Sequence, residues 1–99
     1  MNAPISESDV RKDIKQYLEA MSWFVFHVHQ HGYRCYKGIS DYIAVKNGNV
    51  IFVEVKKTGG EQSKEQIKFE DDIISHKGLY FCVDSLDKLI KNLTGSGLR

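Results

Sequence analysis

The chain has 99 residues, a formal net charge of +1 and 41% hydrophobic residues. This length predicts one domain, residues 1–99, and the share of apolar residues excludes a disordered chain. No apolar run is long enough for a transmembrane helix or a secretion signal, so we expect a cytoplasmic protein with two free thiols, Cys35 and Cys82. The near-zero charge argues against a protein that coats nucleic acid through one broad basic face.

The first half of the chain predicts a helix followed by three strands. Apolar residues at helical spacing predict the helix over residues 7–21. Aromatic and β-branched residues of alternating polarity predict a strand over residues 23–29. Two further strands are expected over residues 39–46 and 50–56. Asn47 and Gly48 lie between them, and this pair is typical of a tight β-hairpin turn.

A second helix is expected to begin after Ser63, which forms a capping box with Gln66. We expect it to end near His76, with Gly78 as its C-terminal stop. On a helical wheel Gln66 falls within an apolar stripe made by Ile67, Phe69, Ile73 and Ile74. A glutamine in that position needs partners inside the protein, so it serves the capping box, a site beneath the helix, or both.

The end of the chain predicts a short strand and one more helix. The strand covers residues 79–83, and either Asp84 or Ser85 caps a helix with apolar residues at helical spacing. Residues 94–99 are expected to form a flexible tail. The element order is then αβββαβα, which predicts an α/β fold with a mixed β-sheet flanked by helices.

Three charged residues of the predicted hairpin suggest chemistry. Glu54 and Lys56 alternate with apolar residues, so both side chains lie on one face at the end of their strand. Taken alone, this pair is most simply an ion pair on a solvated strand end. Asp41, however, stands among apolar residues of the partner strand and needs a partner or a metal. Two carboxylates offer the hard oxygen ligands that suit Mg²⁺ or Mn²⁺, and a nearby ammonium fits phosphodiester hydrolysis.

This set of residues resembles the PD-(D/E)XK nuclease motif, and the surrounding pattern is similar to its VRR-NUC branch. The resemblance extends from Glu7 to about Ile90 and rests on Glu7, Gly38, Asp41, Glu54, Lys56, Gly59 or Gly60, Ser63 and Gln66. It implies a restriction-endonuclease-like core. Ser40 stands where the motif has its proline.

The resemblance also implies roles for individual residues. Metal ligands would be Glu7, Asp41, Glu54 and the carbonyl of Val55, and the catalytic residues would be Asp41, Glu54, Lys56 and Gln66. Contacts to nucleic acid are expected from Arg34, Lys37, Lys57 and Ser63. Arg34, Lys37 and Lys46 form a basic stretch with interleaved tyrosines, which is typical of a DNA-binding surface but also of ordinary surface loops.

Some of these residues allow a different interpretation. Glu7 is also a favourable acid at a helix N-terminus. His27 and His29 match the paired histidines of HUH nucleases, but none of Tyr33, Tyr36 and Tyr42 lies on a predicted helix with a partner lysine or tyrosine at helical spacing. Together with His31 they could suggest zinc, although the loop spacing of a structural zinc site is missing. The simplest interpretation is a set of polar residues on a half-exposed strand.

We therefore expect an Mg²⁺- or Mn²⁺-dependent endonuclease from a phage or bacterium that acts on DNA. By resemblance it would act on branched DNA as a homodimer, similar to a Holliday junction resolvase. The alternative is a catalytically inactive nuclease-fold module that only binds nucleic acid. Two bound divalent ions would raise the formal charge from +1 to roughly +5, so tight DNA binding should depend on metal.

Overall fold

The computed structural model describes residues 6–29 and 36–98. Its helices and strands are α1 (Glu7–Ala20), β1 (Phe24–His27), β2 (Tyr42–Lys46), β3 (Asn49–Val55), α2 (Lys64–Ser75), β4 (Leu79–Val83) and α3 (Leu86–Gly95). The four strands form one sheet in the order β1-β2-β3-β4. The first two pairings are antiparallel and the pairing of β3 with β4 is parallel. The predicted element order and mixed sheet are confirmed.

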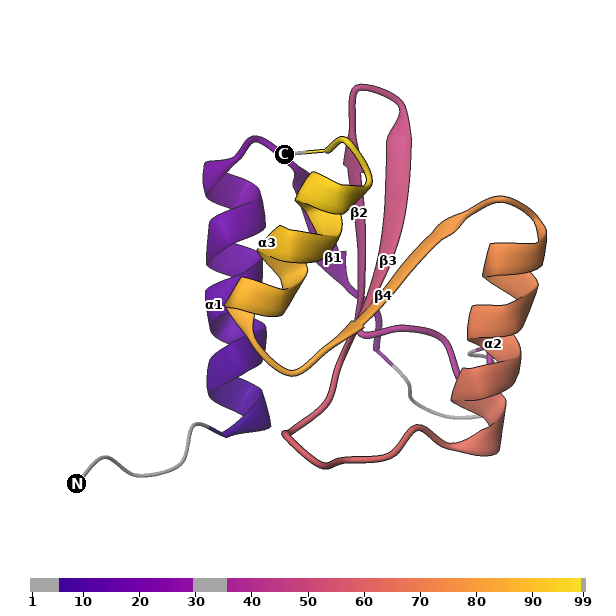
Figure 1. The fold of residues 1–99 in the computed structure, drawn as a ribbon. Helices are drawn as coiled ribbons and strands as arrows, with labels where there is room; N and C mark the ends of the chain where they lie inside the picture. Colours follow the sequence, from indigo (N-terminus) through magenta and orange to yellow (C-terminus); the bar gives the residue numbers. More distant parts are fainter. Residues whose placement is uncertain (1–5, 30–35, 99) are drawn as a thin grey trace.

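The helices lie on the two faces of this sheet. Figure 1 shows α1 and α3 next to each other on one side and α2 apart from them, and α1 contacts α3, β1 and β3. Alternation along β3 sends Ile51 and Val53 toward the α1 side, where both are fully buried. Phe52 points to the opposite face, where the centroid of its ring lies 5.5 Å from the centroid of the Phe69 ring on α2. The sheet therefore has a core on each face.

The main core lies between the sheet and the helices α1 and α3. It contains the apolar residues of α1 that recur at helical spacing, which confirms the periodicity predicted from sequence. Its fully buried side chains include Ile14, Leu18, Ala44, Ile51, Val53 and Leu89. Burying an aliphatic side chain of this kind contributes about 1.5–3 kcal/mol, so this layer is the principal source of the stability that holds the sheet in place.

The ends of three strands differ from the prediction. The strand predicted over 23–29 is reduced to Phe24–His27, and the one over 39–46 begins only at Tyr42. The second of these differences arises because the chain turns at Gly38, where Ile39 N–H donates to the Tyr36 carbonyl at 3.2 Å. The strand predicted over 50–56 is instead Asn49–Val55, a shift of one residue.

Helix α2 ends as predicted, with His76 as its C-cap, but the residue that turns the chain away differs from the prediction. Lys77, and not Gly78, has the left-handed conformation, with φ 68°. Gly78 is needed for space, because a Cβ there would lie 2.7 Å from the Ile73 side chain. Ile67 and Ile74, predicted to belong to the buried stripe of this helix, are exposed. Helix α2 packs on the sheet through Phe69. Ile67 and Ile74 lie at the edges of the apolar stripe and therefore outside this packing contact.

The structure describes residues 94–98 of the predicted tail, and the first of them belong to a helix. Helix α3 continues to Gly95, with Ser85 as its N-cap. Beyond it, Leu98 N–H donates to the Leu93 carbonyl at 2.8 Å and the Leu98 side chain packs against the core. Leu98 is thus partly buried against the core, a contact that the composition of this segment does not predict. Arg99 is outside the described residues.

Candidate active site

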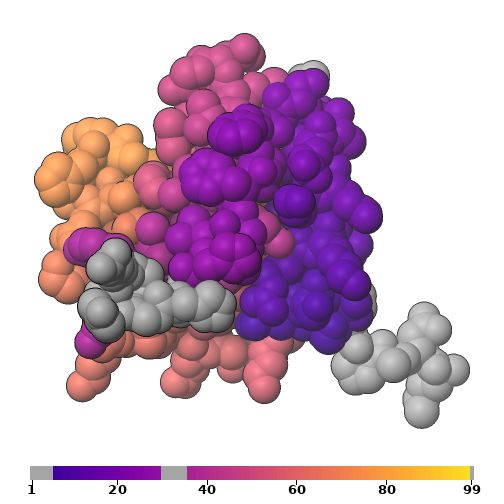
Figure 2. All heavy atoms as spheres, turned by 180° about the vertical axis from the view of Figure 1, so that it is seen from behind, coloured from indigo at the N-terminus to yellow at the C-terminus, as the bar shows by residue number. Residues whose placement is uncertain are grey.

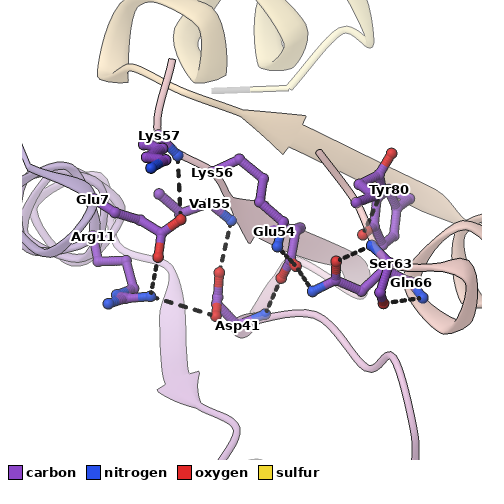
Figure 3. Close-up of polar contacts among 11 residues, drawn as sticks. Glu7, Arg11, Asp41, Glu54, Val55, Lys56, Lys57, Ser63, Gln66 and Tyr80 are labelled. Atoms are coloured by element: carbon purple, nitrogen blue, oxygen red, sulfur yellow. Dashed lines mark hydrogen bonds and ion pairs between the residues drawn. The ribbon is translucent and has the colours of Figure 1, made fainter. Parts of the chain in front are cut away.

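Asp41 and Glu54 lie opposite each other at one end of the hairpin. Asp41 precedes β2 and Glu54 lies near the end of β3, and the register pairs the next residue, Tyr42, with Val53. Asp41 N–H donates to Glu54 Oε1 at 3.2 Å, and Val55 N–H donates to Asp41 Oδ2 at 2.7 Å (Figure 3). The hairpin therefore brings together the two carboxylates that the sequence motif predicted.

The environment of Glu54 disfavours its charge. Its side chain is only 1% exposed. Burial, reinforced by the neighbouring charge of Asp41, raises the pKa of Glu54 to about 8, although Lys56 opposes the shift. In the metal-free protein near neutral pH, a proton on Glu54 thus relieves the repulsion between the two acids. A cation bound between them would have the same effect, which is consistent with a metal site.

Lys56 and Gln66 approach the same carboxylate oxygen. Lys56 Nζ lies 3.6 Å from Glu54 Oε2, and Gln66 Nε2 donates a hydrogen bond to that oxygen. Gln66 also forms the capping box, because its Oε1 accepts from Ser63 N–H at 2.8 Å and its own N–H donates to Ser63 Oγ. The capping box is confirmed, and one side chain caps the helix and contacts the site at the same time.

Gly38 allows α2 to approach the site so closely. Its φ is +82°, and a Cβ at this position would overlap the Glu65 carbonyl and lie 2.7 Å from Gln66 N. The first turn of α2 thus rests directly on the backbone of Gly38. A glycine before Asp41 is required here for two reasons, the left-handed conformation and the missing side chain. This contact positions Gln66 over Glu54.

Glu7 reaches the same region from α1. Its Oε1 accepts from Lys57 N–H at 3.2 Å, and its Oε2 lies 3.2 Å from Arg11 Nη1. The same Arg11 nitrogen lies 3.9 Å from Asp41 Oδ1. Sequence reasoning missed Arg11, although its position four residues after Glu7 on one helix face was a usable signal. Glu7 is therefore linked to Asp41 through a guanidinium group.

These side chains line one cavity of about 250 Å³. It contains every residue predicted to be catalytic or to bind metal, together with four residues that were assigned no role there, Arg11, His27, Val28 and His29. The complete lining is Glu7, Arg11, His27, Val28, His29, Asp41, Glu54, Val55, Lys56 and Gln66. Acidic and basic side chains thus line the same cavity. This arrangement suits a phosphate group that contacts a metal ion held by the acids and also contacts the basic side chains directly.

The residues predicted to contact nucleic acid are dispersed. Lys37 is exposed beside a different cavity, and Lys57 lines a larger one of about 630 Å³ with three aspartates. The Ser63 hydroxyl serves as the helix cap, and Arg34 lies outside the described residues. Lys46 donates to the Met21 carbonyl at 2.7 Å, at the end of β2 opposite to Asp41. Lys37, Lys57 and Lys46 thus line three different cavities.

The donor set fits a hard divalent cation through two carboxylates and one carbonyl. Asp41, Glu54 and the Val55 carbonyl would hold it, since oxygen ligands of this kind suit Mg²⁺ and Mn²⁺. Glu7 is engaged by Lys57 and Arg11. Across residues 6–29 and 36–98, no three histidine, cysteine or acidic side chains converge into a ready-made site. His27 and His29, with ring centroids 4.8 Å apart, accordingly form no zinc site with a third such residue in that part of the chain.

Comparison with known proteins identifies the fold. No protein-family model and no curated protein matches the sequence. Within the part of the chain that the structure describes, no helix is both long and apolar enough to cross a membrane. A solved structure described as a VRR_NUC domain matches with a TM-score of 0.73 and 24% sequence identity, and the match covers 90% of this chain and 94% of that one. The chain therefore has the fold of a VRR_NUC domain, as its motif residues predicted.

Proposed function

We propose that this protein is a metal-dependent endonuclease that hydrolyses DNA phosphodiester bonds. The observation that carries the proposal is the convergence of Asp41, Glu54 and Lys56 in one cavity, at the hairpin end where the motif requires them. The VRR_NUC fold supports it, because the likeness to a solved VRR_NUC domain covers 90% of this chain. A DNA substrate would place the activity in the cytoplasm of a bacterial or phage-infected cell.

The proposed cofactor is Mg²⁺ or Mn²⁺. When bound, such an ion polarises a phosphate oxygen and lowers the pKa of a coordinated water. Asp41 and Glu54 would hold it through carboxylate oxygens, and the hydrogen bond from Val55 N–H at 2.7 Å orients the Asp41 side chain. Gln66 holds Glu54 in position through its amide group, which is itself anchored by Ser63 N–H. The acids are thus held in place before any substrate arrives.

Lys56 is the proposed catalytic cation. It directly follows the last residue of β3, and its ammonium lies 3.6 Å from Glu54 Oε2 in the lining of the cavity. A charged amine in this place orients an attacking water and stabilises the negative charge that develops on the phosphate. Arg11, His27 and His29 lie around the same opening, where they can contact phosphates on either side of the scissile bond.

We further propose that the substrate is branched DNA and that the protein acts as a homodimer. A four-way junction presents two symmetric strands for cleavage, which a two-fold symmetric dimer can engage together. The edge strand β1 supports this, since Phe24 and Phe26 are 66% and 41% exposed. Figure 2 shows side chains of this purple segment projecting from the surface. An apolar, uncharged patch is complementary to itself, as a two-fold contact requires.

The second candidate is a module that has the nuclease fold and binds DNA without cleaving it. A module that has lost its activity is expected to lack at least one of the charged residues of the site. Here Asp41, Glu54 and Lys56 are all present, and both Asp41 and Lys56 contact Glu54. This arrangement favours the enzyme.

The test is cleavage of labelled four-way junctions, flaps and linear duplexes with Mg²⁺ or Mn²⁺, comparing the wild type with Asp41→Asn and Lys56→Met. We expect metal-dependent cleavage by the wild type and a loss of at least about 100-fold in both variants. Lys68→Met is the matched control, because Lys68 is an exposed lysine paired with Asp72 on α2. No cleavage of any substrate by the wild type contradicts the enzyme proposal. Equal cleavage by the variants contradicts the site.

A further inference from the structure

Arg11 connects two acids that come from different parts of the fold. Its Nη1 atom lies 3.2 Å from Glu7 Oε2 on the same helix and 3.9 Å from Asp41 Oδ1 beside the sheet (Figure 3). The side chain is 32% exposed, and it lines the cavity that contains Glu54 and Lys56. One guanidinium group therefore bridges the acid of α1 and the acid of the hairpin.

The charge of Arg11 is permanent, because a guanidinium group is not deprotonated in proteins. In the absence of a metal, it is the cation that faces both Glu7 and Asp41. The second oxygen of each acid is held by a backbone amide, Lys57 N–H for Glu7 and Val55 N–H for Asp41. The oxygens that face Arg11 are consequently the ones that remain for another cation.

This inference rests on the nuclease function proposed above. We propose that Arg11 is a positioning residue that competes with the divalent ion for Asp41, and that its guanidinium turns to a DNA phosphate when the ion binds. Two cations beside the same carboxylate repel each other, so each weakens the binding of the other. A guanidinium at the cavity wall is also well suited to bidentate contact with a phosphate.

The exchange would couple metal binding to DNA binding. Once the ion neutralises Asp41, Arg11 loses a partner and becomes available at the opening of the cavity. The affinity for DNA then increases with metal, and by thermodynamic linkage the affinity for metal increases with DNA. The same residue would keep the site ordered when neither ligand is present, because it ties α1 to the hairpin.

The first experiment measures Mn²⁺ binding by titration calorimetry in the absence of DNA. We expect Arg11→Met and Arg11→Gln to bind Mn²⁺ about fivefold more tightly than the wild type. Lys15→Met is the matched control, because it removes a positive charge from the next turn of α1, where Lys15 pairs with Glu19. It should bind Mn²⁺ as the wild type does. Equal or weaker binding by the two Arg11 variants overturns the inference.

The second experiment measures binding of a short DNA duplex in EDTA and in Ca²⁺. The gain in affinity on adding Ca²⁺ should be smaller in Arg11→Met than in the wild type or in Lys15→Met. An equal gain in all three proteins overturns the inference. The variants should keep their fold, because the bond from Tyr42 OH to Arg11 uses the main-chain carbonyl, at 3.3 Å. Melting curves check this directly.

A further variant separates this inference from the proposed function. Asp41→Ala should lose Mn²⁺ binding, because Asp41 is one of the two central acids of the site. If Asp41→Ala binds Mn²⁺ as tightly as the wild type does, the metal site and this inference both fail. If Asp41→Ala loses the metal while the Arg11 variants match the wild type, the metal site stands and only the role of Arg11 is refuted.

Discussion

The main chain of Asp41 donates a hydrogen bond to the Glu54 carboxylate, at 3.2 Å from Oε1. The Asp41 side chain in turn accepts from the amide of Val55, the residue after Glu54. Each acid is thus held by the backbone of the other strand, and the pair keeps its spacing through the hairpin itself. This reciprocal arrangement explains how two acids can stay close together in a small buried site.

The first prediction concerns stability and pH in the metal-free protein. The pKa of Glu54 is raised to about 8 in the folded state, whereas its ordinary value is 4.5. Between these values the folded state retains a proton that the unfolded state releases, so stability falls as pH rises from about 4.5 to 8. We expect this group to lower the free energy of unfolding by about 1–3 kcal/mol between pH 5 and pH 8.5, measured by urea titration in EDTA.

Two variants isolate the contribution of Glu54 from that of the histidines. Glu54→Gln should show a flatter dependence of stability on pH than the wild type, because it has no carboxyl group to titrate. Glu61→Gln, a change at an exposed glutamate, should keep the wild-type dependence. The explanation fails if the wild type and Glu54→Gln have the same slope.

The second prediction concerns the glycine beneath α2. Gly38→Ala should destabilise the protein by at least about 2 kcal/mol, because the new Cβ would overlap the backbone of α2 in addition to disfavouring the left-handed conformation. Gly48→Ala is the matched control, since Gly48 also has a positive φ, 80°, but a Cβ added there would meet no atom within 4 Å. It should cost only about 1 kcal/mol. Equal losses in thermal or urea unfolding would show that the close contact is unimportant.

The third prediction separates the two contacts of Gln66. Gln66→Glu keeps an acceptor for Ser63 N–H, so the helix cap survives, but it replaces the amide donor that faces Glu54 with a second carboxylate. We expect a loss of about 10- to 100-fold in metal affinity or cleavage, with little change in helix content by circular dichroism.

The control for Gln66 removes a cap elsewhere in the protein. Ser85→Ala deletes the side-chain acceptor for Lys88 N–H at the start of α3. It should cost about 1 kcal/mol of stability and leave cleavage unchanged. If Gln66→Glu cleaves DNA as fast as the wild type, its contact with Glu54 has no catalytic importance.

The fourth prediction concerns the apolar surface of β1. Phe24→Glu and Phe26→Glu should shift a wild-type dimer toward monomer in sedimentation experiments, because two like charges would meet across a two-fold contact. Ile74→Glu is the control, a change at an exposed apolar residue on α2. It should leave the dimer intact. A monomeric wild type, or a dimer that Phe24→Glu does not affect, would contradict the proposed interface.

Local patterns predicted most of the fold. The spacing of apolar residues in α1 and the Asn-Gly pair of the hairpin each depend on neighbours in the chain, and both were confirmed. The capping box of Ser63 and Gln66 is equally local and was also confirmed. The lengths of β1 and β2 were predicted less well. A strand ends where its partner strand ends or where the chain turns, and the residue pattern of a single segment shows neither.

Local patterns were enough to name the two acids and the lysine of the site, since alternation along the predicted strand places Glu54 and Lys56 on one face and the hairpin brings Asp41 opposite Glu54. The residues that surround them depend on how distant segments pack together. The contact of Gln66 with Glu54 depends on the close approach of α2 to Gly38, and the position of Arg11 beside Asp41 depends on how α1 packs on the sheet. These contacts join segments that are distant in the chain. Their geometry follows from packing, which periodicity within a single segment does not encode.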